Sequence, residues 1–422
     1  MNKQSTLIPM IIIGTLFFIF GFVTWLNGSL IPFLKVICDL SSFEALFVTF
    51  AFYIAYTVMA FPMAYFLDKT GYKNGMSLGL VMMFVGSLLF IPAALNAEFL
   101  LFLLALFTLG AGLTLLQTAS NPYIVLVGPI ESAAMRISIM GLINKSAGVL
   151  APIVFTLLVF SGFGTVEDIK VEEIATLSHK LIMPYSAMAG VLFLLALFIK
   201  FSALEELEFS EDEYDESSIF SFPRVILGAI ALFFYVGIEV IAGDTIGLYA
   251  QSLGVVNATA LTSYTMVFMV LSYLVGVFFI PKFLSQEKAL IGSSLLGIVF
   301  LVGIAFSSTS DDSISRLLWG WSGVATLPNS VTFVALLGLS NALVWPTIWP
   351  LALEDLGKHT AKGSALLIMS IAGGALLPLA FGKIATLSGN MQESYLYGII
   401  CYVVILLFAL KGHKIATWCR KC

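Results

Sequence analysis

The chain has 422 residues, of which 59% are hydrophobic and 11% are charged, whereas a soluble domain has roughly 45–50% and 25%. Its 25 acidic residues outnumber its 20 Lys and Arg residues. The chain therefore offers no basic stripe for a phosphate backbone, and nucleic-acid binding is excluded. So few charges could not cover a soluble protein of this size. The composition predicts an integral membrane protein that has the lipid bilayer as its partner.

Apolar stretches long enough to span a membrane recur along the whole chain. A bilayer core about 30 Å thick requires about 20 apolar residues per helix. The candidate spans are 7–31, 43–66, 75–95, 98–126, 136–161, 181–203, 223–250, 259–281, 287–307, 329–353, 361–386 and 391–411. The first lacks a cleavage signal after it, so we expect it to be retained as a span. The pattern predicts an all-α protein with twelve transmembrane helices.

One acidic segment, EELEFSEDEYDESS (205–218), separates the sixth span from the seventh. It is too polar to insert into a bilayer and favours a flexible linker. We therefore predict an N-terminal six-helix bundle (1–203), a cytoplasmic linker (204–222) and a C-terminal six-helix bundle with a short tail (223–422).

The distribution of Lys and Arg predicts the orientation of the spans. With both termini inside, 14 of the 20 basic residues lie on the cytoplasmic side, five lie outside, and Lys145 lies within a span. We therefore expect both termini in the cytoplasm. The halves also resemble each other, since Asn121-Pro122 of the fourth span matches Trp345-Pro346 of the tenth. Parallel repeats of this kind are typical of transporters that hold substrate midway between two halves.

A charged loop, Asp68-Lys69-Thr70-Gly71-Tyr72-Lys73, joins the second and third spans. It resembles the Asp-Arg/Lys-x-Gly-x-Lys/Arg loop of the major facilitator superfamily. We expect Asp68 to face the N-terminus of a neighbouring helix, where a negative charge is favourable, and Lys69 and Lys73 to remain in water. With Gly71, these residues would form a gating loop. An ordinary charged turn is the alternative.

Polar residues cluster in the fourth span, where the sequence reads QTASNPY (117–123). Amides that face lipid are costly, so these side chains should face a wet cavity or a neighbouring helix. Gln117 and Asn121 are four residues apart and share one helix face. They are candidates for binding a polar substrate. Hydrogen bonding to a neighbouring helix is the alternative role.

The motif QTASNPY, followed by Val-x-x-Gly-Pro, resembles the fourth helix of the fucose–galactose–glucose:H⁺ symporter family. The resemblance runs nearly end to end and includes LNGSLIP (26–32), Phe52-Tyr53 with Tyr56, Arg136 with Asn144, FYVGIE (234–239), Pro346-Thr347-Ile348 and Gly373-Gly374-Ala375. It implies a sugar transporter whose first, fourth, seventh and tenth spans line the cavity, and it favours the glucose/galactose and N-acetylglucosamine branches. The fucose branch has an aspartate in place of Gly28 and a glutamate in place of Gln117. Those acids are the family's candidates for proton coupling, so coupling by that route is in doubt here.

Three ionisable residues lie within predicted spans: Lys145, Glu239 and Asp244. Such a group costs about 2.5–3.5 kcal/mol on insertion scales, so each is a candidate for ion coupling. Glu239 lies mid-span, and we expect Asp244, nearer the outer end, to reach water. A structural alternative is an ion pair between Lys145 and one of the two acids. Lys145 could also replace the transported cation, which would give a uniporter.

Sugars are bound by amides and carboxylates on their hydroxyls and by aromatic rings against their apolar faces. The predicted substrate-binding residues are Trp25, Asn27, Gln117, Asn121, Asn144, Glu239, Asn341 and Trp345. We expect Trp349 at the membrane interface, where tryptophan is enriched.

Enzymatic motifs are missing from the sequence: it has no P-loop, no dinucleotide fingerprint and no HExxH. Cys419 and Cys422 lack the second pair that a zinc site needs. We therefore predict no catalytic residues, no metal site and no cofactor beyond a co-transported Na⁺ or H⁺. A drug or metabolite exporter on the same fold is a rival interpretation. The favoured interpretation is a monomeric hexose importer of the bacterial cytoplasmic membrane, with Glu239 carrying the coupling charge.

Overall fold

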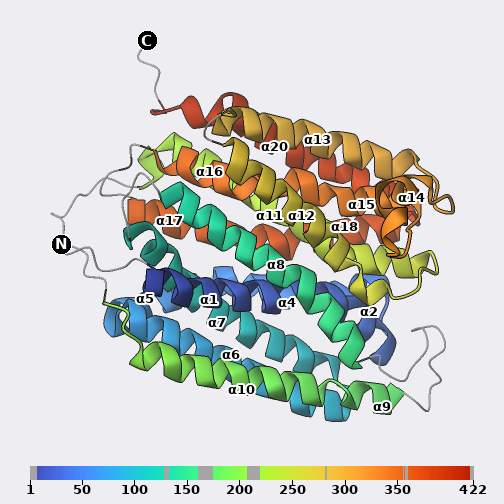
Figure 1. The fold of residues 1–422 in the computed structure, drawn as a ribbon, viewed down its shortest axis with the longest axis horizontal. Coiled ribbons are helices and arrows are strands. Elements are labelled where there is room, and N and C mark those ends of the chain that lie inside the picture. The colour runs from blue at the N-terminus through green and yellow to red at the C-terminus, as the bar shows by residue number, and fades with distance from the viewer. Residues whose placement is uncertain are drawn as a thin grey trace.

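The structure is a computed structural model that describes residues 7–127, 133–159, 174–206, 219–280, 283–354, 356 and 360–418. Within these ranges the regular elements are helices, and no strand occurs. Most of the helices run side by side along the long axis of the molecule (Figure 1). This is the arrangement expected of a bundle that spans a bilayer, because a helix satisfies its own backbone hydrogen bonds.

In the described part of the first half, the α-helices are α1 Leu7–Trp25, α2 Asn27–Ile37, α3 Ser42–Ala45, α4 Phe47–Val58, α5 Ala60–Thr70, α6 Tyr72–Asn96, α7 Phe99–Leu126, α8 Ala133–Val159, α9 Ile174–His179 and α10 Ile182–Phe201. In the described part of the second half, they are α11 Pro223–Ser252, α12 Thr262–Phe279, α13 Gln286–Phe306, α14 Ser313–Trp319, α15 Asn329–Asn341, α16 Val344–Leu353, α17 Thr360–Met369, α18 Gly373–Ser388, α19 Met391–Ser394 and α20 Ile399–Leu410.

The predicted spans are confirmed in number and place. Over the described residues, 11 helical segments are long and apolar enough to cross a membrane. The pair Ser42–Val58 and Ala60–Leu67, bent by 52°, makes the twelfth. Pro62 explains the bend, because it has no N–H to donate to the carbonyl of Val58, four residues earlier. The protein is therefore a multi-pass membrane protein.

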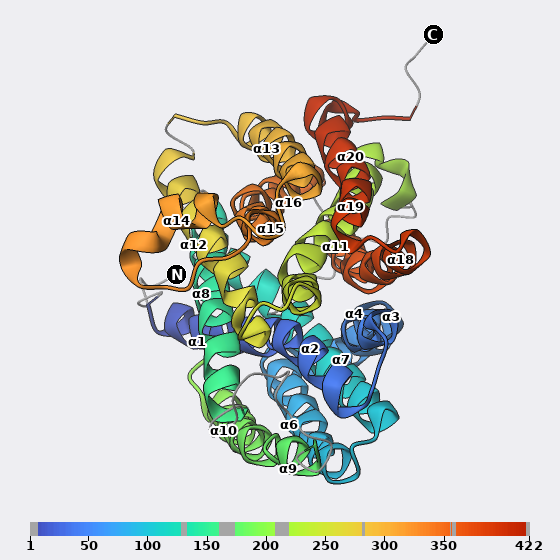
Figure 2. The same ribbon diagram turned by 90° about the vertical axis from the view of Figure 1, so that its right-hand side faces the viewer.

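The two halves of the chain form two groups of helices. Viewed from the end that carries α2 and α14, α1–α10 lie below and α11–α20 lie above, with α8 beside α12 at the boundary (Figure 2). Of the predicted linker, residues 207–218 lie outside the described part of the chain, and Ile219–Ser221 form a short 3-10 helix.

Hydrogen bonds join the halves at the end that carries α2, α3 and the 3-10 helix Ala258–Ala260, which we name the closed end. The Ser29 hydroxyl donates to the Thr259 carbonyl at 2.6 Å. The Thr156 and Thr259 hydroxyls lie 2.9 Å apart. The Thr49 hydroxyl donates to the Asp244 carboxylate at 3.1 Å. Each of these bonds runs from the first half of the chain to the second, so the closed end holds the halves together.

Gly28 allows the backbones to approach at the closed end. A Cβ added there would collide with the Thr262 hydroxyl and lie 3.0 Å from the Gly243 carbonyl oxygen. The Thr262 hydroxyl is itself fixed, because it donates to that carbonyl at 2.7 Å. Small residues serve this purpose at helix contacts in membranes. This contact therefore requires a residue without a side chain at position 28.

We expect Gly28→Ala to lower the free energy of unfolding by about 1–3 kcal/mol, the usual cost of overpacking a well-packed site. Thermal unfolding of the purified protein in detergent would measure it. Gly292→Ala is the matched control, since nothing lies within 4 Å of a Cβ added at Gly292, and alanine is the better helix former. Equal midpoints for the two variants would contradict the packing role of Gly28.

Candidate functional site

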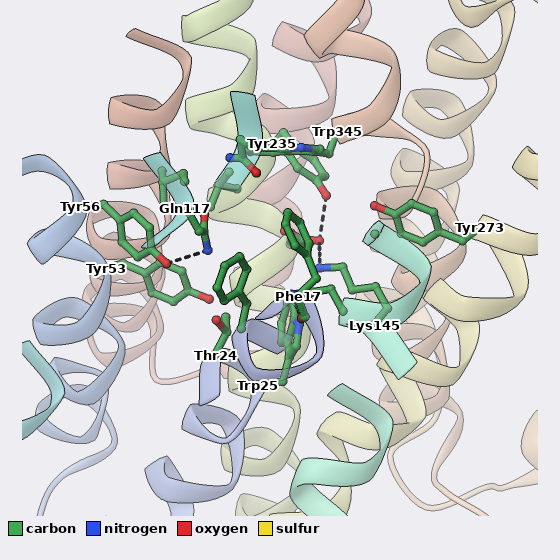
Figure 3. Close-up of a pocket in the computed structure, with 17 residues that line it drawn as sticks. Phe17, Thr24, Trp25, Tyr53, Tyr56, Gln117, Lys145, Tyr235, Tyr273 and Trp345 are labelled. Carbon is green, nitrogen blue, oxygen red and sulfur yellow. Dashed lines mark hydrogen bonds and ion pairs between the residues drawn. The ribbon is translucent and has the colours of Figure 1, made fainter. Parts of the chain in front are cut away.

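A cavity of about 130 Å³ lies at the centre of the molecule, between the two groups of helices. It is lined by residues of α1, α4, α7 and α8 from the first half and of α11, α12 and α16 from the second, together with Ile371. Its polar side chains point toward one another across the space in Figure 3. The residues are Phe17, Phe20, Thr24, Trp25, Tyr53, Tyr56, Gln117, Asn121, Gly141, Asn144, Lys145, Tyr235, Val236, Glu239, Tyr273, Trp345 and Ile371.

Most of the predicted substrate-binding residues line this cavity. They are Trp25, Gln117, Asn121, Asn144, Glu239 and Trp345. Asn27 and Asn341 do not. Both are buried among the helices, and the side-chain amide oxygen of Asn341 accepts a hydrogen bond from the Tyr402 hydroxyl at 2.7 Å. The structure therefore places these two amides inside the protein, away from the cavity lining.

One side of the cavity holds an ion pair. The Lys145 ammonium lies 2.7 Å from Oε1 of Glu239, and the Tyr235 hydroxyl donates to the same oxygen at 2.8 Å. The ammonium also lies over the Trp25 ring, 4.2 Å from its centroid. Both charged side chains are only 9% exposed. The structural alternative, an ion pair between Lys145 and an acid of the seventh span, is observed with Glu239 as the acid.

Trp25 is held in place by two glycines. A Cβ added at Gly148 would lie 2.6 Å from its Cδ1 atom, and one added at Gly243 would lie 2.5 Å from its Cζ3 atom. The indole is thus packed between α8 and α11, and it presents its face to Lys145. A ring face attracts a cation by about 2 kcal/mol or more where water is excluded. Trp25 therefore supports the charged side of the cavity.

The opposite side of the cavity is neutral and polar. The Gln117 amide donates to the Tyr56 hydroxyl at 3.1 Å, and the Tyr53 and Tyr56 rings stack with centroids 6.2 Å apart. In Figure 3 these residues face Lys145 and Tyr273 across the cavity, with Phe17 between them. Asn121 reaches the cavity from the same helix face as Gln117, as their spacing predicts. This side offers amide and phenol groups that can donate and accept hydrogen bonds.

An aromatic wall completes the cavity. Trp345 is half-buried and stacks on Trp349, with centroids 5.2 Å apart and planes 29° apart. Trp349 is only 9% exposed, so its predicted place at the membrane interface was wrong. Its spacing of four from Trp345 puts both rings on one helix face, and that face turns inward.

Asp244 lies five residues after Glu239 on α11 but does not line the cavity. Its side chain is completely buried, so the expectation that it reaches water was wrong. The reason is its position at the closed end, where Thr49 of the other half covers it and donates a hydrogen bond.

The loop between α5 and α6, for which the sequence predicts a gating role, is partly as expected. Gly71 joins α5 to α6 with φ +78, a conformation that favours glycine. Lys69 lies over the Tyr65 ring at 4.3 Å. Lys73 is not simply in water, since its ammonium donates to the Ser202 carbonyl at 2.7 Å. The side chain of Asp68 lies outside the described part of the structure.

A different acid, Glu206, caps the N-terminus of α6. Its carboxylate accepts hydrogen bonds from the backbone N–H groups of Tyr72 and Lys73. The start of the linker is thereby fixed to the gating loop. The sequence prediction missed this because Glu206 is more than 130 residues away along the chain.

Four tyrosines of the cavity are absent from the predicted site: Tyr53, Tyr56, Tyr235 and Tyr273. For three of them the sequence carries a signal. Tyr235 lies four residues before Glu239, and Tyr53 and Tyr56 are three apart, so each shares a helix face with a partner. Tyr273 carries no such signal, because its place depends on how α12 packs against α8.

Together these groups suit a neutral, hydroxyl-rich molecule. Amides and phenols provide neutral hydrogen-bond partners, the ion pair provides charged ones, and Trp345 provides an apolar face. A bundle of twelve spans with such a cavity midway between two halves has the architecture of a membrane transporter.

Comparison with known proteins agrees with this architecture. The profile of the Major Facilitator Superfamily matches residues 13–378, and the chain belongs to that superfamily. A glucose/galactose transporter of Brucella abortus is 32% identical over 408 residues, which cover 94% of this chain and 92% of the relative. The L-fucose-proton symporter of Escherichia coli is 26% identical over 438 residues, which cover 99% and 95%.

Solved structures show the same fold. The transporter FucP in its outward conformation has a TM-score of 0.71 and 25% identity, with 96% of this chain and 99% of that chain covered. A D-xylose-proton symporter has a TM-score of 0.69 and 14% identity, with 97% and 98% covered, which is a likeness of fold alone. The resemblance inferred from the motifs is confirmed.

We expect Lys145→Met to destabilise the protein by about 3–5 kcal/mol, because it leaves the buried Glu239 charge without its partner. The double variant Lys145→Met/Glu239→Gln should recover most of that loss, since no unpaired charge remains. Thermal unfolding in detergent would measure both variants. Lys200→Met, at an exposed lysine of α10, is the control and should change little. A double variant no more stable than Lys145→Met would contradict the importance of the pair.

Proposed function

We propose that this protein imports a hexose, glucose or galactose, across the bacterial cytoplasmic membrane by symport with a cation. The observation that carries the proposal is the central cavity, where an ion pair and neutral amides face each other beside an aromatic wall. The names of the relatives, a glucose/galactose transporter and an L-fucose-proton symporter, support the same class of substrate.

Each part of the cavity has a role in this proposal. Trp345 packs against the apolar face of the sugar ring. The hydroxyls of the sugar form hydrogen bonds with the side-chain amides of Gln117, Asn121 and Asn144, since an amide can both donate and accept. On the charged side, Glu239 and Lys145 form hydrogen bonds with further hydroxyls of the sugar. Hydrogen bonds to charged groups are about twice as strong as those between neutral groups.

The closed end fits one state of an alternating-access cycle. If both termini are cytoplasmic, as the positions of Lys and Arg favour, the loops at the closed end, such as 38–41 and 253–257, face outward. The conformation then corresponds to a transporter closed to the outside. For sugar to enter, the hydrogen bonds from Ser29 and Thr49 to the other half must break.

Uniport is a second candidate, and the ion pair is the observation that favours it. Lys145 neutralises Glu239 at 2.7 Å, so the cavity needs no transported cation for charge balance. The sequence favours Glu239 as the carrier of the coupling charge. Because Lys145 already neutralises it, Glu239 is better suited to binding sugar than to carrying a transported cation.

Purified protein in liposomes would test the proposal. Labelled glucose, galactose, N-acetylglucosamine and fucose would be offered under imposed proton or sodium gradients. Uphill accumulation of glucose or galactose with one gradient is the expected result. Equilibration without accumulation would support uniport, and the absence of any hexose exchange would refute the proposed function.

We expect Trp345→Ala to raise the half-saturating concentration of the transported hexose roughly tenfold or more, because truncating a buried aromatic contact costs about 2 kcal/mol. Initial rates of uptake in liposomes would measure it. Trp321→Ala is the matched control, since Trp321 is 84% exposed in the 3-10 helix Gly320–Ser322 that follows α14. Equal shifts for both variants would show that Trp345 has no specific contact with sugar.

A further inference from the structure

Asp244 combines complete burial with an incomplete set of partners. Its side chain is 0% exposed. One carboxylate oxygen accepts a hydrogen bond from the Thr49 hydroxyl of the other half at 3.1 Å. The second oxygen, Oδ1, is buried and has no hydrogen-bond partner. A native structure rarely leaves a buried polar atom in this condition, so the atom requires an explanation.

The charges around Asp244 do not neutralise it. Lys145 on α8 is the cation that acts on it, but the Lys145 ammonium already pairs with Glu239 at 2.7 Å. Glu239, on the same helix as Asp244, adds repulsion. Tyr53 on α4 also interacts with it electrostatically and is itself buried. An isolated carboxylate at such a place costs far more than a neutral carboxyl group.

A proton suits this site better than a metal cation. Hard cations take several oxygen ligands at once, whereas the side-chain hydrogen bond that the structure shows at Asp244 comes from one hydroxyl, that of Thr49. In the parts of the chain that the structure describes, no group of three or more His, Cys, Asp or Glu residues could hold a metal ion.

We infer that Asp244 is the proton-carrying group that couples sugar movement to the opening and closing of the closed end. When the closed end opens, the hydrogen bond between Thr49 and Asp244 breaks, and the Asp244 carboxylate takes up a proton from the water outside. The resulting neutral carboxyl group can be buried, so the end closes. The proton later leaves to water in the cavity, which Tyr53 borders. One proton is taken up outside and one is released inside. The inference rests on the proposed function, because it assigns the coupled ion to one residue.

The experiment compares Asp244→Asn with the wild-type protein in liposomes, using labelled glucose and galactose. Asparagine cannot titrate but keeps the size of the side chain. With a pH gradient of about one unit and no membrane potential, one proton per sugar supports about tenfold accumulation. We expect this accumulation for the wild-type protein and a ratio near one for Asp244→Asn. Counterflow, which needs no net proton movement, should stay within about threefold of the wild-type rate.

Asp39→Asn is the matched control, because Asp39 is an exposed carboxyl in the loop after α2 at the same end. It should accumulate sugar as the wild-type protein does. Accumulation by Asp244→Asn equal to the wild type would overturn the inference. Wild-type accumulation driven by sodium alone, or no wild-type accumulation under either gradient, would overturn it as well. A wild-type protein without counterflow of any hexose would instead refute the proposed function.

Asp244→Glu keeps the inference testable if Asp244→Asn does not fold. It retains a carboxyl group with a longer reach, so we expect accumulation to persist with a shifted pH midpoint. A pH profile of accumulation identical to that of the wild type would count against Asp244 as the proton carrier.

Discussion

The ion pair between Lys145 and Glu239 is the interaction on which the centre of this protein depends. It joins α8 of the first half to α11 of the second at 2.7 Å. A buried charge is tolerated only if it is paired and hydrogen-bonded, and Tyr235 and Trp25 supply the further contacts. The pair therefore provides the charged side of the cavity, lies against Trp25 and links the two halves of the chain.

The contacts at the closed end are of a different kind. They consist of single hydroxyl hydrogen bonds and of close backbone approach at Gly28. Hydrogen bonds between helices in a membrane average only about 0.6 kcal/mol. Several such bonds can hold two surfaces together, yet they can be broken one after another. The central ion pair differs from these contacts, because it joins two full charges beside the cavity.

The fold was largely predictable, because a bilayer demands a length and an apolar composition that the sequence displays directly. The site was less so. Gln117 and Asn121 were identified because spacing alone puts them on one face, whereas Asn27 and Asn341 were misplaced because a small rotation of a helix decides whether an amide faces the cavity or a neighbour. The burial of Asp244 depends on the state of the closed end, and the capping of α6 by Glu206 depends on a contact distant in sequence.

The two acids of α11 lie in different surroundings. Glu239 forms an ion pair and faces the cavity, while Asp244, five residues on, accepts a hydrogen bond from Thr49 of the other half and leaves Oδ1 without a partner. Gly28, where the fucose branch resembled by this sequence has an aspartate, packs against Gly243, the neighbour of Asp244. A carboxyl group at either position would lie at the same contact between the halves. The close approach at Gly28 leaves no room for a side chain, and the carboxyl group that the structure places at this contact is that of Asp244 on α11.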